Sequence, residues 1–221
     1  KNMFSSYLDY VAYQPSTLNN IKRNLSQFIS ENKDSDNNKS LRVLLLKNIQ
    51  TSPDAYWYDL LSWLYVQEKQ YNKSFTQEKA LYKRNPESLD RIIDLAITAK
   101  DDGDTGTATA IFNYIIEASQ ERDVLLLAHQ SLLEMQAKTA TKQTLDAINE
   151  KYLELFKTFG EYASTLALQL SYGQFLAFNY NQPEEASEFL KKAYKLDISP
   201  YQEGMVKLRL ADILVLQEKF N

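Results

Sequence analysis

Apolar side chains recur every three or four residues along almost the whole chain, which is the spacing of one buried face of an α-helix. Leu60, Leu61, Leu64 and Tyr65 follow this spacing, and so do the apolar residues of the segment 92–99. No segment alternates apolar and polar residues over the length of a half-buried β-strand. The pattern predicts an all-α chain of roughly twelve helices, joined by short connections into hairpins.

All five prolines are expected at helix boundaries. Pro15, Pro53, Pro86 and Pro200 lie where a helical pattern stops, and Pro183 opens one. Proline fits the first turn of a helix, but inside a helix it lacks the N–H group that the backbone hydrogen bonds need. The prolines are therefore expected to separate consecutive helices.

A pattern of large, small and aromatic residues returns after 34 residues, and it resembles the tetratricopeptide repeat. Ser62 and Ala96 stand at the same place in two successive copies, where a small residue allows the two helices of a hairpin to pack closely. The match covers most of the chain but is weak between 123 and 160. The residues that carry the resemblance are Tyr58, Leu61, Ser62, Tyr65, Tyr71, Ser74, Pro86, Ile92, Leu95, Ala96, Ala99, Gly103, Ala108, Phe112, Tyr172, Gly173, Leu176, Ala186, Leu190, Ala193, Leu210, Ala211, Leu214 and Phe220.

The resemblance implies a single α-solenoid over residues 1–221, a right-handed superhelix of antiparallel helix pairs. About five repeats are expected, with a half-repeat at each end. The expected segments are divergent N-terminal helices at 1–53, two well-matched repeats at 55–120, a divergent long hairpin at 121–160, and one repeat with a cut-off first helix at 161–221. Because half-repeats leave apolar faces uncovered, we expect a piece of a longer array that associates through these uncapped ends.

Two segments, 82–91 and 210–221, are similar to exported tetratricopeptide proteins of flavobacteria and other Bacteroidota. Members of that group have no assigned biochemical activity. The resemblance implies residence in the periplasm or cell envelope. The cytoplasm is the alternative, because the absence of cysteine is compatible with either compartment.

The composition excludes several classes of protein. The 221 residues contain no cysteine and a single histidine, which excludes disulfide scaffolds, thiolate zinc sites and His-based catalytic triads. The 25 basic and 29 acidic residues give a net charge of −4, and no run of Lys or Arg is longer than a pair. We therefore expect no nucleic-acid partner. No apolar stretch approaches the roughly 20 residues that span a bilayer, so no membrane span is expected.

The sequence offers little catalytic chemistry. His129 has no second histidine with which to share a metal ion, and an apolar run precedes it. The segment 103–106 contains two glycines, but it falls where the repeat needs a turn between helices. The acidic pairs 101–102 and 184–185 fit helix starts and turns. We therefore predict no catalytic, metal or cofactor-binding residue, and no enzymatic activity.

A binding groove is the better prediction. In tetratricopeptide proteins the first helix of each hairpin lines a concave groove, and tyrosine and tryptophan are frequent anchors at such surfaces. Packing of Trp63 between repeats is the alternative to a role in binding. The residues expected to line the groove are Tyr56, Asp59, Trp63, Gln67, Ile93, Ile97 and Lys100, with Asp90 and Asp101 beside them.

The resulting hypothesis is a scaffold that binds a protein or peptide in its groove. The lining of acidic, aromatic and aliphatic residues favours an apolar segment that carries a basic residue. A structural subunit of an envelope or secretion assembly is the first alternative. An α/α enzyme that uses a pair of carboxylates is the second.

Overall fold

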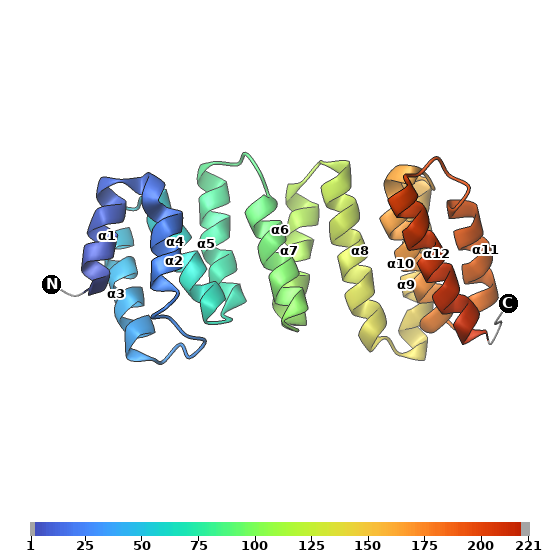
Figure 1. Ribbon diagram of the computed structural model, residues 1–221, viewed down its shortest axis with the longest axis horizontal. Coiled ribbons are helices and arrows are strands. Elements are labelled where there is room, and N and C mark those ends of the chain that lie inside the picture. The colour runs from blue at the N-terminus through green and yellow to red at the C-terminus, as the bar shows by residue number, and fades with distance from the viewer. Residues whose placement is uncertain (1–2, 218–221) are drawn as a thin grey trace. The chain divides into compact units, whose positions relative to one another are not determined.

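The computed structural model describes residues 3–217 and confirms that this range is all-α (Figure 1). It contains twelve α-helices and two short 3₁₀ turns, and no residue from 3 to 217 belongs to a β-strand. The helices are α1 (Met3–Tyr13), α2 (Leu18–Leu25), α3 (Asp36–Thr51), α4 (Ala55–Gln67), α5 (Tyr71–Arg84), α6 (Asp90–Asp101), α7 (Thr105–Ala118), α8 (Arg122–Thr139), α9 (Lys142–Phe159), α10 (Leu166–Phe178), α11 (Pro183–Ala193) and α12 (Pro200–Leu216). The 3₁₀ turns are η1 (Pro15–Thr17) and η2 (Ala163–Thr165).

The helices pack mainly against their neighbours in the sequence. α3 packs on α4, α4 on α5 and α5 on α6, and the same holds for α8 with α9, α10 with α11, and α11 with α12. Such sequential pairing is consistent with a helical repeat. The chain divides into two compact units, which we call unit 1 (Lys1–Glu117) and unit 2 (Ala118–Asn221).

In unit 1, the core joins the helices from α1 to α4. Leu8 of α1, Leu41 of α3 and Leu60 of α4 belong to one cluster of buried apolar side chains. α4 and α5 then approach each other at two small residues, Ser62 and Ser74, whose hydroxyl oxygens lie 2.8 Å apart. Ser62 therefore lies at a close contact between two helices, as its place in the repeated pattern predicts.

In unit 2, α10 and α11 meet at a glycine. A Cβ atom on Gly173 would lie 2.7 Å from Cγ of Leu190, a side chain that is fully buried. Rings from α9 and α10 pack nearby, with the centroids of Tyr152 and Phe175 5.4 Å apart. The hydroxyl of Tyr152 lies 2.8 Å from that of Ser171, so the buried phenol has a hydrogen-bond partner.

The prolines lie at helix boundaries, with one correction to the predicted arrangement. Pro183 is the first residue of α11, as expected. Pro200 does not end a helix but opens α12, and its place at the first position follows from the residue before it. The hydroxyl of Ser199 accepts a hydrogen bond from the Gln202 amide, and the Gln202 side chain accepts one from the Ser199 amide. This capping box makes residues 199–202 a helix start.

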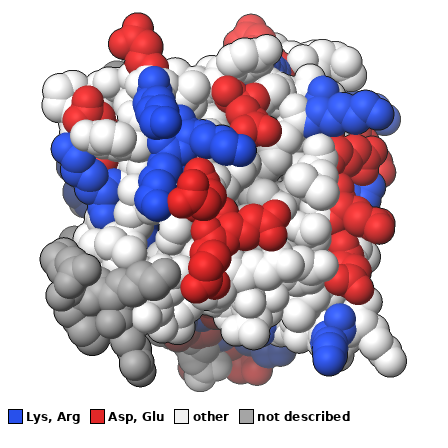
Figure 2. All heavy atoms as spheres, turned by 90° about the vertical axis from the view of Figure 1, so that its right-hand side faces the viewer, with Lys and Arg blue, Asp and Glu red and all other residues white. Residues whose placement is uncertain are grey.

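α12 begins at Pro200 rather than near residue 210, where the repeat pattern places the last helix. Phe220, which the pattern assigns to the same helix, lies outside the described residues. Several apolar side chains of α12 are exposed, among them Tyr201 at 78%, Leu208 at 67% and Val215 at 60%. On the side of unit 2 that Figure 2 shows, basic and acidic side chains are mixed with uncharged surface.

No helix within residues 3–217 is both long enough and apolar enough to cross a lipid bilayer.

Candidate functional site

Two adjoining hollows open on unit 1, and three charged side chains line both of them. Hollow 1 has a volume of about 450 Å³ and lies among η1, α2, α4, α5 and the start of α6. Hollow 2 has a volume of about 340 Å³ and lies among α2, α4, α5 and α6. The side chains that the two hollows share are Asp59, Glu78 and Arg91.

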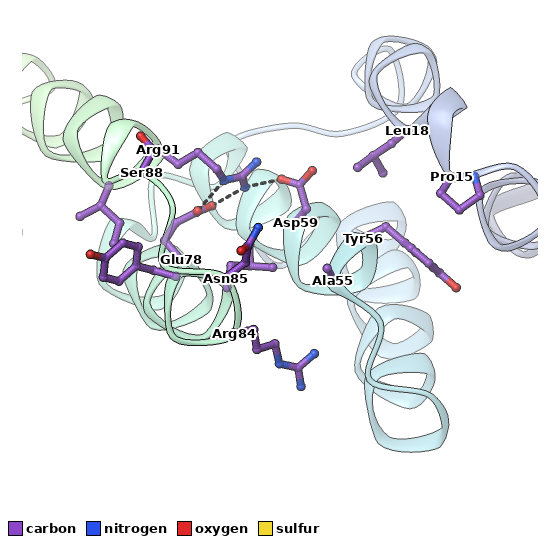
Figure 3. A pocket seen from close by; sticks show the side chains of 13 residues that line it. Pro15, Leu18, Ala55, Tyr56, Asp59, Glu78, Arg84, Asn85, Ser88 and Arg91 are labelled. Carbon is purple, nitrogen blue, oxygen red and sulfur yellow. Dashed lines mark hydrogen bonds and ion pairs between the residues drawn. The ribbon is translucent and has the colours of Figure 1, made fainter.

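Arg91 of α6 joins the two carboxylates of the shared wall (Figure 3). Its Nε donates to Oε2 of Glu78 at 2.7 Å, and one terminal nitrogen donates to Oε1 at 2.7 Å, so guanidinium and carboxylate meet as a two-pronged pair. The same terminal nitrogen donates to Asp59 of α4. Hydrogen bonds to Glu78, followed by those to Asp59, raise the pKa of Arg91 above its ordinary value, so the guanidinium stays charged.

The cluster extends to two further helices. Nζ of Lys22 on α2 lies 2.9 Å from Oδ1 of Asp59, and the Ser62 hydroxyl donates to Glu78. Two cations and two carboxylates from α2, α4, α5 and α6 therefore balance each other. Since the Glu78 side chain is only 6% exposed, these partners replace the water that would otherwise contact its carboxylate.

The local sequence explains why Glu78 faces the cluster. Ser74 and Glu78 are four residues apart on α5, so they lie on the same face of that helix, one turn apart. Ser62 of α4 contacts both of them. The other buried residues of α5 are Tyr71, Ser74 and Phe75, so Glu78 brings the one carboxylate to the buried face of this helix.

Hollow 1 is mostly apolar beyond the shared charges. Leu18, Leu81 and Ile92 line it together with the rings of Tyr56 and Tyr82. The hydroxyl of Tyr56 donates to Oδ2 of Asp54 at 2.9 Å, which fixes the orientation of this ring. Such a surface suits an apolar side chain from another molecule.

The rim of hollow 1 carries polar groups. Arg84 is directed away from the Arg91 cluster in Figure 3. It donates to the Pro53 carbonyl and to the Tyr58 hydroxyl, and its guanidinium carbon lies 4.3 Å from the centre of the Tyr58 ring. Arg84 is therefore held on the rim and does not occupy the hollow.

Of the residues predicted to line the groove, α4 supplies the ones that border the hollows. Tyr56 lines hollow 1, Trp63 lines hollow 2, and Asp59 lines both. Gln67 also lies on α4 but borders neither hollow.

The predicted residues of α6 lie on that helix but do not border either hollow. These residues are Ile93, Ile97 and Lys100, with Asp90 and Asp101 at the ends of the helix. The face of α6 that lines hollow 2 contains Arg91, Asp94, Leu95 and Thr98 instead. Arg91, Asp94 and Thr98 each follow a predicted position, 90, 93 or 97, by one residue. The observed face of α6 is therefore rotated by about 100° around the helix axis from the predicted face.

The hollows offer no ready metal or acid–base site. Within residues 3–217, no group of three or more His, Asp or Glu side chains is placed to hold a metal ion. The two carboxylates of the shared wall, Asp59 and Glu78, both accept from Arg91. A pair held in this way suits structure or binding better than proton transfer.

The lone histidine lies in unit 2, on α8, and is partly buried. Burial lowers the pKa of His129 below its ordinary value of 6.5, and the positive charge of Lys151 lowers it further. The folded state therefore favours the neutral imidazole.

This shift makes His129 a source of pH dependence. The unfolded chain takes up the proton at a higher pH than the folded chain, so the free energy of unfolding should fall as the pH drops from about 7 to 5.5. His129→Gln should remove this part of the decline, which urea unfolding followed by circular dichroism at several pH values measures. Parallel pH profiles for the wild type and the variant would contradict the assignment.

Comparison of the sequence with models of known protein families finds no match, and comparison with curated proteins finds none either.

Proposed function

We propose that unit 1 binds a segment of a partner protein across hollows 1 and 2, and that the helix pairs form a tetratricopeptide-like solenoid that presents this surface. One observation carries the proposal: two adjoining hollows combine apolar and aromatic walls with a shared wall whose charges are already satisfied. A partner can therefore enter the hollows without leaving a buried charge of the shared wall unpaired. Both volumes fall in the range of about 300–1,000 Å³ that is usual for ligand sites.

The aromatic residues on α4 support a binding role. Tyr56 and Trp63 border the two hollows and lie seven residues apart, which places them two turns apart on one face of the helix. Trp63 is partly buried, so part of its ring is covered by the protein and part is open to a partner. Large amphipathic rings at the centre of a surface contribute much of the affinity of many interfaces.

Trp63→Ala should weaken partner binding at least tenfold, because truncation removes an anchor worth about 1.4 kcal/mol or more. Random peptides displayed on phage are selected on the immobilised wild-type protein, and the affinities of the enriched peptides are measured by isothermal titration calorimetry. The matched control is Tyr201→Ala, which removes an exposed ring from unit 2 and should leave the affinity unchanged.

Circular dichroism establishes that the Trp63→Ala variant keeps its helices. A folded variant that binds the selected peptides as tightly as the wild type would overturn the proposal. So would a selection on the wild type that enriches no peptide over a blank surface.

A structural role in an envelope or secretion assembly is the second candidate. The exposed apolar face of α12 favours it, because Tyr201, Leu208 and Val215 would become buried against another subunit. The enzyme alternative has less support, because Arg91 already bonds to both carboxylates of the shared wall. The periplasm or cell envelope is the compartment that we propose, on the resemblance to exported tetratricopeptide proteins.

A further inference from the structure

One carboxylate in hollow 2 has no partner within residues 3–217. Asp94 lines this hollow and is exposed, and its side chain makes no ion pair or hydrogen bond to any described residue. The other charges of the hollow pair with one another, Lys22 with Asp59 and Arg91 with both Asp59 and Glu78. The hollow therefore carries one uncompensated negative charge, and it lies on Asp94.

The surroundings of Asp94 suit an alkyl chain that ends in a cation. Trp63, Val66 and Leu95 line the same hollow and offer an indole ring and two aliphatic side chains. A cation near an indole face is attracted by the electrons of the ring, and the methylene groups of Lys or Arg pack well on aliphatic surface.

An anion would meet less favourable groups in hollow 2. Arg91 and Lys22 are its cations, and both already bond to carboxylates of the protein. An incoming carboxylate would compete with Asp59 and Glu78 for these donors and would be repelled by Asp94. The charges of hollow 2 therefore favour a positively charged occupant over a negatively charged one.

We infer that the segment bound by unit 1 places a lysine or arginine side chain in hollow 2, with its charge at Asp94, and an apolar side chain in hollow 1. This inference rests on the proposed function and specifies the kind of partner: a basic and apolar segment rather than an acidic one.

The test repeats the phage selection on three variants alongside the wild type. Peptides selected on the wild type should be enriched in Lys or Arg at one fixed distance from an apolar residue. Selection on Asp94→Asn should lose the basic preference and keep the apolar one. Selection on Asp94→Lys should enrich Asp or Glu at the same place. The control is Asp90→Asn, which makes the same change of charge on α6 outside both hollows and should keep the basic preference.

Calorimetry on one selected peptide supplies the magnitude. Asp94→Asn should weaken binding about threefold in low salt, because the variant loses an exposed ion pair but keeps the contact between the peptide cation and the Trp63 ring. Replacing the basic residue of the peptide by glutamine should weaken binding to the wild type by more than this factor, because it also removes the cation–aromatic contact, and should weaken binding to Asp94→Asn by less than it weakens binding to the wild type.

The outcomes separate this inference from the proposed function. The wild type could enrich peptides that have no basic residue but bind Trp63→Ala more weakly. That result would overturn the inference and still support binding of a partner across hollows 1 and 2. An equal loss of basic preference in Asp94→Asn and Asp90→Asn would also overturn it, because the effect would then be one of general charge. Failure to enrich any peptide overturns the proposed function itself.

Discussion

Replacement of Arg91 by methionine is expected to lower the free energy of unfolding of unit 1 by about 2–3 kcal/mol. Loss of one partner from a buried ion pair usually costs about 3–5 kcal/mol, because the remaining charge stays buried without compensation. The Arg91 side chain is 50% exposed, so water can partly replace it, and we expect a value below that range. Asp59 keeps Lys22, whereas Glu78 keeps only the Ser62 hydroxyl among its partners in this cluster.

Tryptophan fluorescence during urea unfolding measures this effect, because both tryptophans of the chain, Trp57 and Trp63, lie on α4 in unit 1. The matched control is Arg23→Met. Arg23 is exposed on α2, and its replacement should change the free energy of unfolding by less than about 0.5 kcal/mol.

A double variant isolates the ion pair between Arg91 and Glu78. Glu78→Gln should cost much less in the Arg91→Met background than in the wild type, since it then removes a charge that has lost its partner. Equal costs in both backgrounds would show that the two side chains do not stabilise each other. That result would contradict the role of the cluster as a connection between α5 and α6.

The helices could be predicted from the sequence because their signals are local. A period of three to four apolar residues marks a buried helix face wherever it occurs, and proline restricts the backbone at its own position. Pro200 shows where local reasoning failed. A proline after an apolar run fits the end of one helix as well as the start of the next, and only the cap formed by Ser199 and Gln202 distinguishes them.

The candidate site was predicted in part, and the difference lies in α6. Tyr56, Asp59 and Trp63 of α4 border the hollows, and the register that placed them there came from Ser62. The same register applied to α6 predicts residues that lie one position before those that line hollow 2. The rotation of a helix depends on what it packs against, and α6 is held by ion pairs from Arg91 to α4 and α5. A repeat pattern alone does not contain this information.

Glu78 and Arg91 were missed as site residues because their partners lie far along the chain. Arg91 pairs with Glu78, 13 residues away, and with Asp59, 32 residues away. A usable signal did exist. Glu78 stands at helical spacing between Phe75 and Tyr82, on the apolar side of its helix, and a carboxylate at an interior position requires a cation nearby. A charged residue on an otherwise apolar helix face is therefore a place to look for a paired charge.

Gly173→Ala is expected to lower the free energy of unfolding of unit 2 by about 1–2 kcal/mol, although alanine is the better helix former. The new Cβ atom would lie 2.7, 2.8 and 2.9 Å from three side-chain carbons of Leu190, which is fully buried and cannot move into solvent. Overpacking of this kind costs about 1–3 kcal/mol, whereas the gain in helix propensity is about 1 kcal/mol at most. The contact between α10 and α11 therefore decides the sign of the effect.

Gly204→Ala is the matched control, and it should have the opposite effect. Gly204 lies within α12, and a Cβ atom there would meet nothing within 4 Å, so the substitution should raise the free energy of unfolding by up to about 1 kcal/mol. Circular dichroism at 222 nm follows the helices during urea unfolding, while tryptophan fluorescence reports on unit 1. If Gly173→Ala were as stabilising as Gly204→Ala, the two helices could not be in the close contact described. The requirement for a small residue at position 173 would then have no structural basis.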